Sequence, residues 1–152
     1  VVTYMEQKLG FHGQEMADYL NKKCGLLGVS GVSSDMRDVT AAADAGNDRA
    51  RLATEMLAYQ IKKYIGSYAA AMGGLDCVVF TGGIGENDAR MRASVCENMG
   101  FLGISIDPEK NLQRPKDVLD ITGKGSRVKM LVICTNEELM IARDTKKLVE
   151  AR

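Results

Sequence analysis

The feature that most constrains the fold of this chain is a short apolar run followed at once by a glycine-rich segment. The stretch from Asp76 to Thr81 contains the run Cys-Val-Val-Phe, and Gly82 to Gly85 follows directly. A continuous apolar run of this length is typical of a strand covered on both faces, as in parallel sheets. The glycines then predict a tight turn that leads into a helix.

Strand-like and helix-like patterns alternate along the rest of the chain. Further strands are predicted at Ile104 to Ile106, at Val128 to Cys134 and, as a short edge strand, around Val118 to Ile121. Helices are predicted as two short segments between Thr3 and Lys23, and at Asn47 to Met72, Ala89 to Asn98 and Glu137 to Glu150. The glycine- and serine-rich segment from Gly25 to Asp38 is predicted to be a packed loop. This alternation predicts an α/β fold.

The long helix has clear boundaries and an apolar face. Asn47 and Asp48 are good N-capping residues, and Gly73 and Gly74 are expected to end the helix. Periodicity alone is at least as compatible with an ordinary core helix as with a contact face. The face comprises Leu52, Met56, Leu57, Gln60, Ile61, Tyr64, Ile65, Tyr68 and Met72.

Composition excludes several classes of function. The chain has 20 basic and 20 acidic residues, so it lacks the positive field that would attract nucleic acid or an anionic membrane. One histidine and four cysteines without a C-x-x-C pair do not suit a zinc cluster or a Ser-His-Asp triad. Val1 is not an initiator methionine, and no signal segment follows it. We therefore expect a piece of a longer cytoplasmic protein.

The segment from Val78 to Asn87 is the first that could carry chemistry. Ligands of open α/β sheets bind outside the carboxyl ends of the strands, where glycines let backbone amides approach a phosphate closely. The segment is not a Walker A loop, because no Lys-Ser or Lys-Thr follows it, and Asp88 stands where G-x-G-x-x-G has its third glycine. A nucleotide contact and a plain strand-to-helix turn both remain open.

Two further segments each allow a functional and a structural interpretation. Ser30 to Asp38 contains Arg37, whose planar guanidinium could stack on a base, but the segment also suits a serine-rich helix cap. Thr135 to Glu138 lies between a predicted strand and a predicted helix. Its carboxylates either complement the helix dipole or supply oxygen ligands to Mg²⁺.

Taken together, these segments resemble the acetate kinase family, within the superfamily of sugar kinases, Hsp70-type ATPases and actin. The resemblance covers nearly the whole chain and includes Asn21 to Gly31, Tyr64 to Gly74, the glycine segment from Gly82 to Asn87, and Asn136 to Arg143. It implies the C-terminal part of an actin/Hsp70/sugar-kinase-like (ribonuclease H-like) domain, with an incomplete sheet flanked by helices. Residues 1–152 would be the C-terminal nucleotide-binding portion, with the N-terminal half absent.

The resemblance also implies an activity and its residues. The activity is reversible, ATP-dependent phosphorylation of acetate to acetyl phosphate by direct in-line transfer, with Mg²⁺ (or Mn²⁺). Glu137 matches the essential magnesium-associated glutamate of the family and is therefore expected to be both catalytic and metal-associated. The residues expected along the adenosine are Asp35, Met36 and Arg37, and those expected to hold the rest of the nucleotide are Gly83, Ile84, Gly85 and Asn87. We expect the three segments to converge on one ATP or ADP molecule.

Several catalytic features of the family are missing from this chain, and their absence bears on whether the isolated chain is active. The acetate pocket, the active-site arginines, the catalytic histidine and a second magnesium carboxylate belong to sequence before Val1, and His12 does not match that histidine. The isolated chain is therefore expected to be inactive. The resemblance also implies a homodimer, and the helix from Asn47 to Met72 is the candidate for part of that contact. Propionate kinase, or a non-catalytic nucleotide-binding or dimerisation fragment, remains an alternative.

Overall fold

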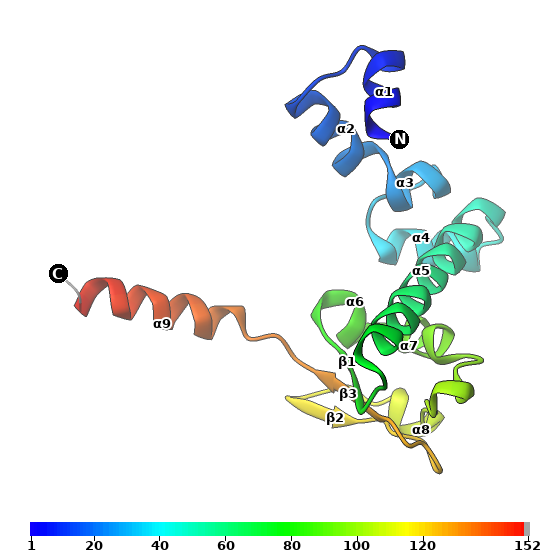
Figure 1. The fold of residues 1–152 in the computed structure, drawn as a ribbon, viewed down its shortest axis with the longest axis vertical. Coiled ribbons are helices and arrows are strands. Elements are labelled where there is room, and N and C mark those ends of the chain that lie inside the picture. The colour runs from blue at the N-terminus through cyan, green and yellow to red at the C-terminus, as the bar shows by residue number, and fades with distance from the viewer. Residues whose placement is uncertain (151–152) are drawn as a thin grey trace. The chain divides into compact units, whose positions relative to one another are not determined.

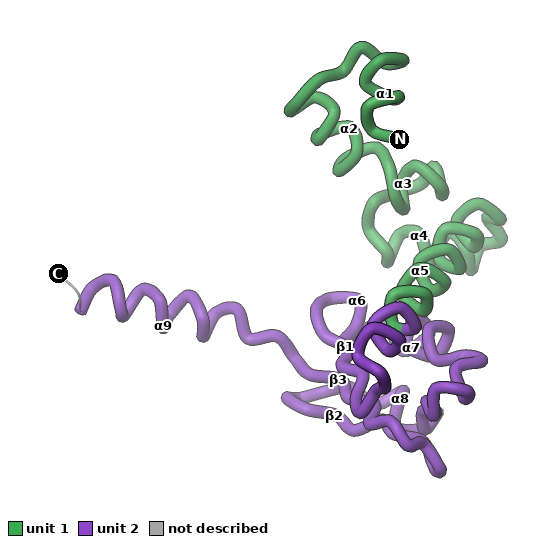
Figure 2. The backbone as a smooth tube through the Cα atoms, in the orientation of Figure 1, with its two compact units in different colours: residues 1–65 green, residues 66–152 purple. Residues whose placement is uncertain are grey.

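A computed structural model describes residues 1–150, which divide into two compact units. Unit 1 is Val1–Ile65, and unit 2 begins at Gly66 (Figure 2). The long helix α5, Asp48–Met72, starts in unit 1 and ends in unit 2.

The regular elements that the structure describes in unit 1 are helices. Besides the start of α5, it contains α1 (Val2–Leu9), α2 (Gln14–Lys23), α3 (Gly25–Ser30) and α4 (Met36–Asp44) (Figure 1). Helices α1 and α2 confirm the two predicted short helices. Helices α3 and α4 overturn the prediction of a loop from Gly25 to Asp38.

Packing explains why the glycine- and serine-rich segment is helical. Val39, Ala50 and Ala53 form a buried cluster, against which Leu26 and Val29 of α3 pack. The side chain of Arg49 donates from Nε to the Val29 carbonyl at 2.9 Å and from Nη2 to the Gly28 carbonyl at 3.1 Å. These bonds satisfy carbonyls near the end of α3 that have no partner within the helix. Tertiary contacts therefore outweigh a composition that favours a loop.

Helix α5 confirms its predicted limits. Asn47 Oδ1 accepts a hydrogen bond from the Ala50 N–H at 3.0 Å, and Gly73 follows the last residue with φ +73°. The buried residues of this helix are small: Ala50, Ala53, Ala58 and Ala69. Several large side chains of the helix are exposed: Leu52, Met56, Tyr59, Tyr64, Tyr68 and Met72. The predicted face is therefore partly exposed in the part of the chain described, and both interpretations of it, core helix and dimer contact, stay predictions.

Unit 2 contains a small mixed sheet with strand order β1-β3-β2 (Figure 1). β1 and β3 are parallel, with Phe80 opposite Val132, whereas β2 is antiparallel to β3. The elements in chain order are β1 (Cys77–Phe80), α6 (Gly82–Asn87), α7 (Ala89–Cys96), the 3₁₀ helix η1 (Gly100–Leu102), α8 (Pro108–Asn111), β2 (Val118–Asp120), β3 (Lys129–Ile133) and α9 (Glu137–Glu150).

Three details of unit 2 differ from the sequence prediction. Gly82 to Gly85 is the first part of the short helix α6 and not a turn. β1 has one covered face only among the described residues, because Val78 is buried while Val79 is 47% exposed. Ile104 to Ile106 is not a strand: Ile104 is buried, but the segment pairs only through a single bridge from Ile106 to Thr122.

The remaining predictions for unit 2 are confirmed. β2 is a short edge strand, β3 lies within the predicted strand, and α9 has the predicted limits. A small mixed sheet flanked by helices confirms the α/β class. Within residues 1–150, no helix combines the length and apolarity that crossing a membrane would require.

Candidate functional site

The parallel pairing of β1 and β3 brings their carboxyl ends to one edge of the sheet. Residue 81 and residues 134–135 follow the paired residues Phe80 and Val132 within a few positions. The glycine segment and the start of α9 are therefore neighbours, although they are about 50 residues apart in sequence. This is the edge at which α/β sheets bind ligands.

The glycines of α6 are required for two different reasons. Gly82 has φ +69°, a conformation that strains other residues. A Cβ on Gly85 would lie 3.1 Å from the Phe80 carbonyl carbon, so only glycine lets α6 lie this close to β1. A Cβ on Gly83 would meet nothing within 4 Å, so the fold does not explain a glycine there. The open space at Gly83 suits the approach of a ligand.

The other predicted residues of this segment have exposed side chains. Ile84 is 37% exposed. The side chain of Asn87, at the end of α6, is also exposed and donates from Nδ2 to the Gly83 carbonyl at 3.0 Å. Together, the two residues give α6 an accessible apolar group and an accessible amide beside Gly83.

Glu86 joins the two strand ends. Its Oε1 accepts hydrogen bonds from the Gly82 N–H at 2.9 Å, and from the N–H and the hydroxyl of Thr135 at 2.8 Å each. The Thr135 N–H, followed by the Thr135 hydroxyl, holds the pKa of the Glu86 carboxyl below its ordinary value. Burial raises the pKa of the neighbouring Cys134 thiol, and the charge of Glu86 adds to that effect. A fixed negative charge therefore lies between the glycine segment and α9.

Arg92 supports the glycine segment from within unit 2. Its side chain is 2% exposed and donates from Nη1 to the carbonyls of Gly85 at 2.9 Å and Glu86 at 3.0 Å. The same guanidinium donates to Asn111, from Nε to Oδ1 at 2.7 Å and from Nη2 to the carbonyl at 2.6 Å. Burial lowers the pKa of Arg92, but a guanidinium stays charged in proteins. The last carbonyls of α6 are thus held by a buried cation.

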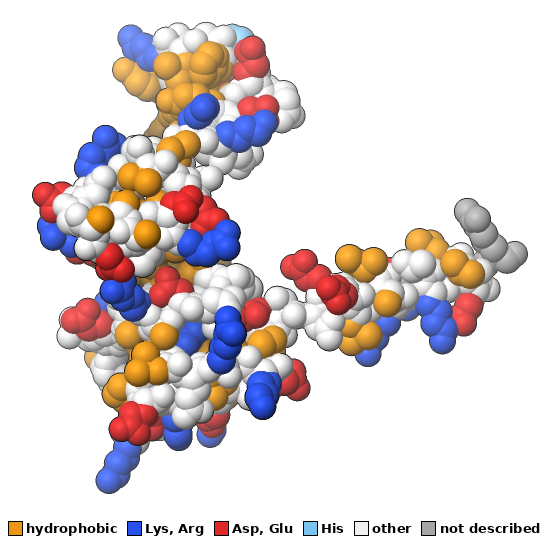
Figure 3. All heavy atoms as spheres, turned by 180° about the vertical axis from the view of Figure 1, so that it is seen from behind, with side chains coloured by type: hydrophobic (Ala, Val, Ile, Leu, Met, Phe, Trp, Pro, Cys, Tyr) orange, Lys and Arg blue, Asp and Glu red, His pale blue; other side chains and the backbone are white. Residues whose placement is uncertain are grey.

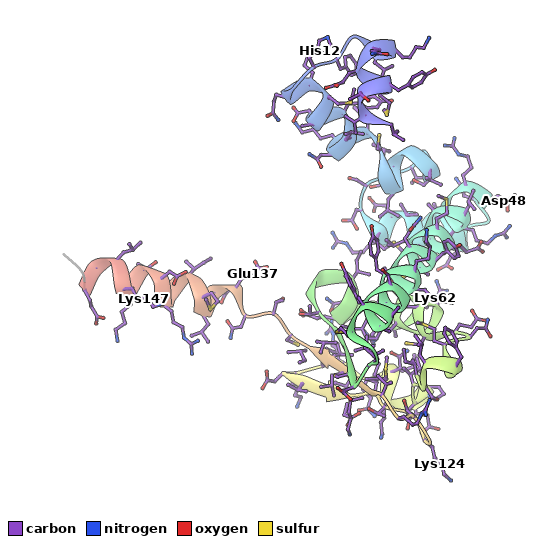
Figure 4. The ribbon with its side chains drawn as sticks, viewed as in Figure 1. His12, Asp48, Lys62, Lys124, Glu137 and Lys147 are labelled. Atoms are coloured by element: carbon purple, nitrogen blue, oxygen red, sulfur yellow. The ribbon has the colours of Figure 1, made fainter. Side chains whose placement is uncertain are left out.

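Glu137 is the first residue of α9 (Figure 4). Asn136 precedes it, and its Oδ1 accepts a hydrogen bond from the Leu139 N–H at 3.0 Å, which caps the helix. In the described part of the chain, no three His, Cys, Asp or Glu side chains gather into a group that could enclose a metal ion. Magnesium on a nucleotide needs only one or two carboxylates, because phosphate and water oxygens complete its octahedron. The exposed carboxylate of Glu137 fits that requirement.

Asp35, Met36 and Arg37 lie in unit 1, at the start of α4. Asp35 caps this helix, because its Oδ1 accepts a hydrogen bond from the Arg37 N–H at 2.8 Å. The guanidinium of Arg37 pairs with the same carboxylate at 2.6 Å and lowers the pKa of Asp35 to about 2.

The pairing leaves Arg37 accessible, whereas Met36 is not. The Arg37 side chain remains 90% exposed, so its planar face is open to a stacking partner. Met36 is 8% exposed and belongs to the core, so it can offer a ligand mainly its backbone.

The structure therefore brings two of the three predicted segments together. The glycine segment and Thr135 to Glu137 are joined through Glu86. That Asp35 to Arg37 completes the same site stays a prediction, because this segment belongs to the other unit.

Sequence reasoning missed Glu86 and Arg92 as residues that shape the site. The one available signal was Glu86 itself, an acidic residue one turn after the glycine at which the helix begins. Arg92 gave no signal, because its neighbours in sequence look like those of an exposed helix.

Comparison with known proteins decides the family. A model of the acetokinase family matches residues 1–143. The chain belongs to the acetokinase family. This result agrees with the resemblance stated from the sequence, and it covers both units.

Individual family members are similar along nearly the whole chain. The acetate kinase of Moorella thermoacetica is 53% identical over 151 residues, which are 99% of this chain and 38% of that protein. The acetate kinase of Phocaeicola vulgatus is 54% identical over 144 residues, which are 95% of this chain and 36% of that protein. The chain thus spans little more than a third of the length of these relatives.

Solved structures give the same result for the fold. The crystal structure of Porphyromonas gingivalis acetate kinase matches with a TM-score of 0.86 and 45% identity, covering 97% of this chain and 37% of that one. A propionate kinase from Francisella tularensis subsp. tularensis SCHU S4 matches with a TM-score of 0.79 and 41% identity, covering 92% of this chain and 35% of that one. Both kinds of acyl kinase therefore contain this acetokinase fold.

Proposed function

We propose that this chain is the nucleotide-binding side of an acetate kinase, which transfers the γ-phosphoryl group of ATP to acetate and also catalyses the reverse reaction. The main support is the acetokinase match over residues 1–143, together with the juxtaposition of the glycine segment and α9 at one sheet edge. In this proposal residues 1–152 are the C-terminal portion of the enzyme. The acetate pocket lies in the rest of the enzyme.

Each predicted site residue has a role in this proposal. Asp35, Met36 and Arg37 lie along the adenosine, with the exposed Arg37 guanidinium stacked on the base and Met36 contributing backbone. Gly83 and Gly85 bring the backbone of α6 close to the phosphates and ribose, and Ile84 and Asn87 contact the nucleotide with their exposed side chains. Phosphoryl transfer depends mainly on such positioning.

Glu137 is the proposed metal-associated residue of this chain. Its carboxylate would hold Mg²⁺ (or Mn²⁺) through oxygen contacts, either directly or through water. When bound, the ion neutralises charge on the transferring phosphoryl group. The chain contributes by fixing this carboxylate beyond the carboxyl end of β3, next to the glycine segment.

Further properties follow from the same proposal. The enzyme is proposed to be a homodimer, because α5 exposes a row of large apolar side chains. A cytoplasmic location is proposed because ATP is the phosphoryl donor. Propionate kinase is the second candidate, since a propionate kinase matches this chain with a TM-score of 0.79 and the acyl pocket lies outside the chain.

The test is a kinetic comparison in a full-length enzyme that carries this segment. Formation of the acyl phosphate, acetyl phosphate from acetate or propionyl phosphate from propionate, is measured over a range of ATP and Mg²⁺ concentrations. We expect a higher kcat/KM for acetate, and we expect Glu137→Ala to lower kcat by about 100-fold or more and to change the Mg²⁺ dependence.

Two outcomes would contradict this proposal. A higher kcat/KM for propionate would favour the second candidate. Wild-type kinetics in Glu137→Ala would remove the proposed role of that residue. Glu109→Gln, which removes another exposed carboxylate of unit 2, is the control and should leave kcat and the Mg²⁺ dependence unchanged.

A further inference from the structure

The carboxylate of Glu86 links two segments that the proposed function uses for different purposes. Oxygen Oε1 of Glu86 accepts from the Gly82 N–H at the start of α6, and from the N–H and hydroxyl of Thr135 beyond the end of β3. Three donors lie within 2.9 Å of one oxygen, and such hydrogen bonds are strongest when the acceptor carries a full charge. The linkage is therefore strongest with an ionised carboxylate.

The position of Thr135 connects this linkage to the start of α9, where Glu137 lies. Thr135 lies two residues before Glu137, and the intervening Asn136 caps α9. Fixing both hydrogen-bonding groups of Thr135 therefore fixes the point and direction from which α9 begins. Upstream of it, the Cys134 N–H bonds to the Asp117 carbonyl at 2.9 Å, which continues the pairing of β3 with the β2 side. From Thr135 onward, the linkage to Glu86 replaces strand pairing.

The remainder of α9 supplies little other support. The helix has no buried residue, and its apolar side chains Leu139, Met140 and Ile141 are exposed, as are Leu148 and Val149 near its end. Hydrophobic side chains are visible between charged ones along this helix in Figure 3. In the described structure, the hydrogen bonds of Glu86 are thus a main restraint on the first turn of α9.

We propose that Glu86 is a positioning residue, which holds the first turn of α9 and its Glu137 carboxylate against the glycine segment of the nucleotide site. This role rests on the proposed function and deepens it. Glu86 does not touch the nucleotide or the metal, but acts through Thr135. A residue that served only to cap α6 would accept the hydrogen bond from the Gly82 N–H, but it would not accept hydrogen bonds from Thr135.

The first experiment measures position without turnover. In the full-length enzyme, amide hydrogen exchange of residues 135–140 is compared between wild type, Glu86→Gln, Thr135→Val and Thr135→Ser. We expect exchange about tenfold faster in Glu86→Gln and in Thr135→Val, because the first turn of α9 loses its restraint. Thr135→Ser keeps both donors and should retain slow exchange. Unchanged exchange in Glu86→Gln would overturn the inference.

The second experiment uses coupling between the two residues. We expect Glu86→Gln and Thr135→Val each to lower kcat by about tenfold and to raise the Mg²⁺ concentration for half-maximal rate. The double variant should lose less than about twofold more than either single variant, because both remove one linkage. Additive losses, or wild-type Mg²⁺ dependence in Thr135→Val, would overturn the proposal. Glu109→Gln and Thr145→Val are the matched controls, since both residues are exposed and lie away from the linkage.

The two experiments also separate this inference from the proposed function. If the wild-type enzyme did not phosphorylate acetate or propionate, the proposed function would fail. The exchange measurement would still decide whether Glu86 restrains α9, because it needs no turnover.

Discussion

Arg92 shows how a single charged residue becomes part of the interior. An isolated buried cation would be unstable, but the guanidinium reaches three carbonyl oxygens and one amide oxygen with short hydrogen bonds. Its planar fork matches acceptors that lie on two elements, α6 and α8. The geometry therefore requires arginine and not merely a positive charge.

We predict that Arg92→Lys lowers the free energy of unfolding by about 1–3 kcal/mol, because one ammonium leaves buried acceptors without partners. Urea unfolding, followed by circular dichroism, measures the change. Arg143→Lys, on the exposed surface of α9, is the control and should stay within about 0.5 kcal/mol of wild type. Equal stability of the two variants would show that the Arg92 hydrogen bonds contribute little.

Asp35 gives a prediction that depends on pH. Its pKa is about 2 in the folded chain, because of the Arg37 guanidinium and N–H, against about 3.9 in an unfolded chain. A depressed pKa means that the ionised carboxylate stabilises the fold fully above the unfolded value, and that this contribution is lost as pH falls through about 2. Carboxyl-carbon NMR should show a midpoint near 2 in wild type and one closer to the ordinary value in Arg37→Ala. The same midpoint in both proteins would remove Arg37 as the cause.

Among the helices and strands, sequence patterns correctly predicted those whose limits depend on residues close in sequence. The limits of α5 and α9 follow from capping residues and glycines, and β3 follows from a run of apolar residues. Helix α3 was missed because its helicity depends on packing against Val39 and on Arg49, about 20 residues away. Ile104 to Ile106 was mistaken for a strand because burial of Ile104 produces an apolar pattern without strand pairing.

The candidate site divides in the same way. The glycine segment and Glu137 were identified because they stand next to recognisable elements. The linkage from Glu86 to Thr135 spans 49 residues, and local patterns carry no information about such a contact. The two interpretations of α5 stay open for a related reason, because periodicity shows that a face is apolar but not what covers it.

Helix α6 provides a paired prediction. Gly83→Ala adds a Cβ in open space within a helix, so we expect stability to rise by up to about 1 kcal/mol, while the KM for ATP rises by about tenfold because the methyl group meets the nucleotide. Gly85→Ala places its Cβ 3.1 Å from the Phe80 carbonyl carbon and should lower stability by about 1–3 kcal/mol. Thermal unfolding and ATP kinetics in the full-length enzyme separate the two effects. An unchanged KM in Gly83→Ala would exclude a close nucleotide contact there.

At the scale of the whole molecule, α5 exposes several large apolar side chains, including Leu52 and Met56, while the residues that it buries are alanines. We predict that Leu52→Glu with Met56→Glu shifts the full-length enzyme from dimer to monomer, because charges in an apolar interface are left unpaired. Light scattering after size-exclusion chromatography measures the mass. Leu112→Glu, which changes another exposed leucine, is the control and should leave the mass unchanged. A dimer that survives the double change would place the contact elsewhere.

The bond between Arg92 and Asn111 also limits how the chain can vary in length. Asn111 must end α8 where the guanidinium can reach it, so the segment between them, which includes η1, has a nearly fixed span. Insertions or deletions there would withdraw the amide from the arginine and disturb the carbonyls of the glycine segment. The loop after Leu112 lies beyond this bond, so changes of length should accumulate in that loop when related chains are aligned.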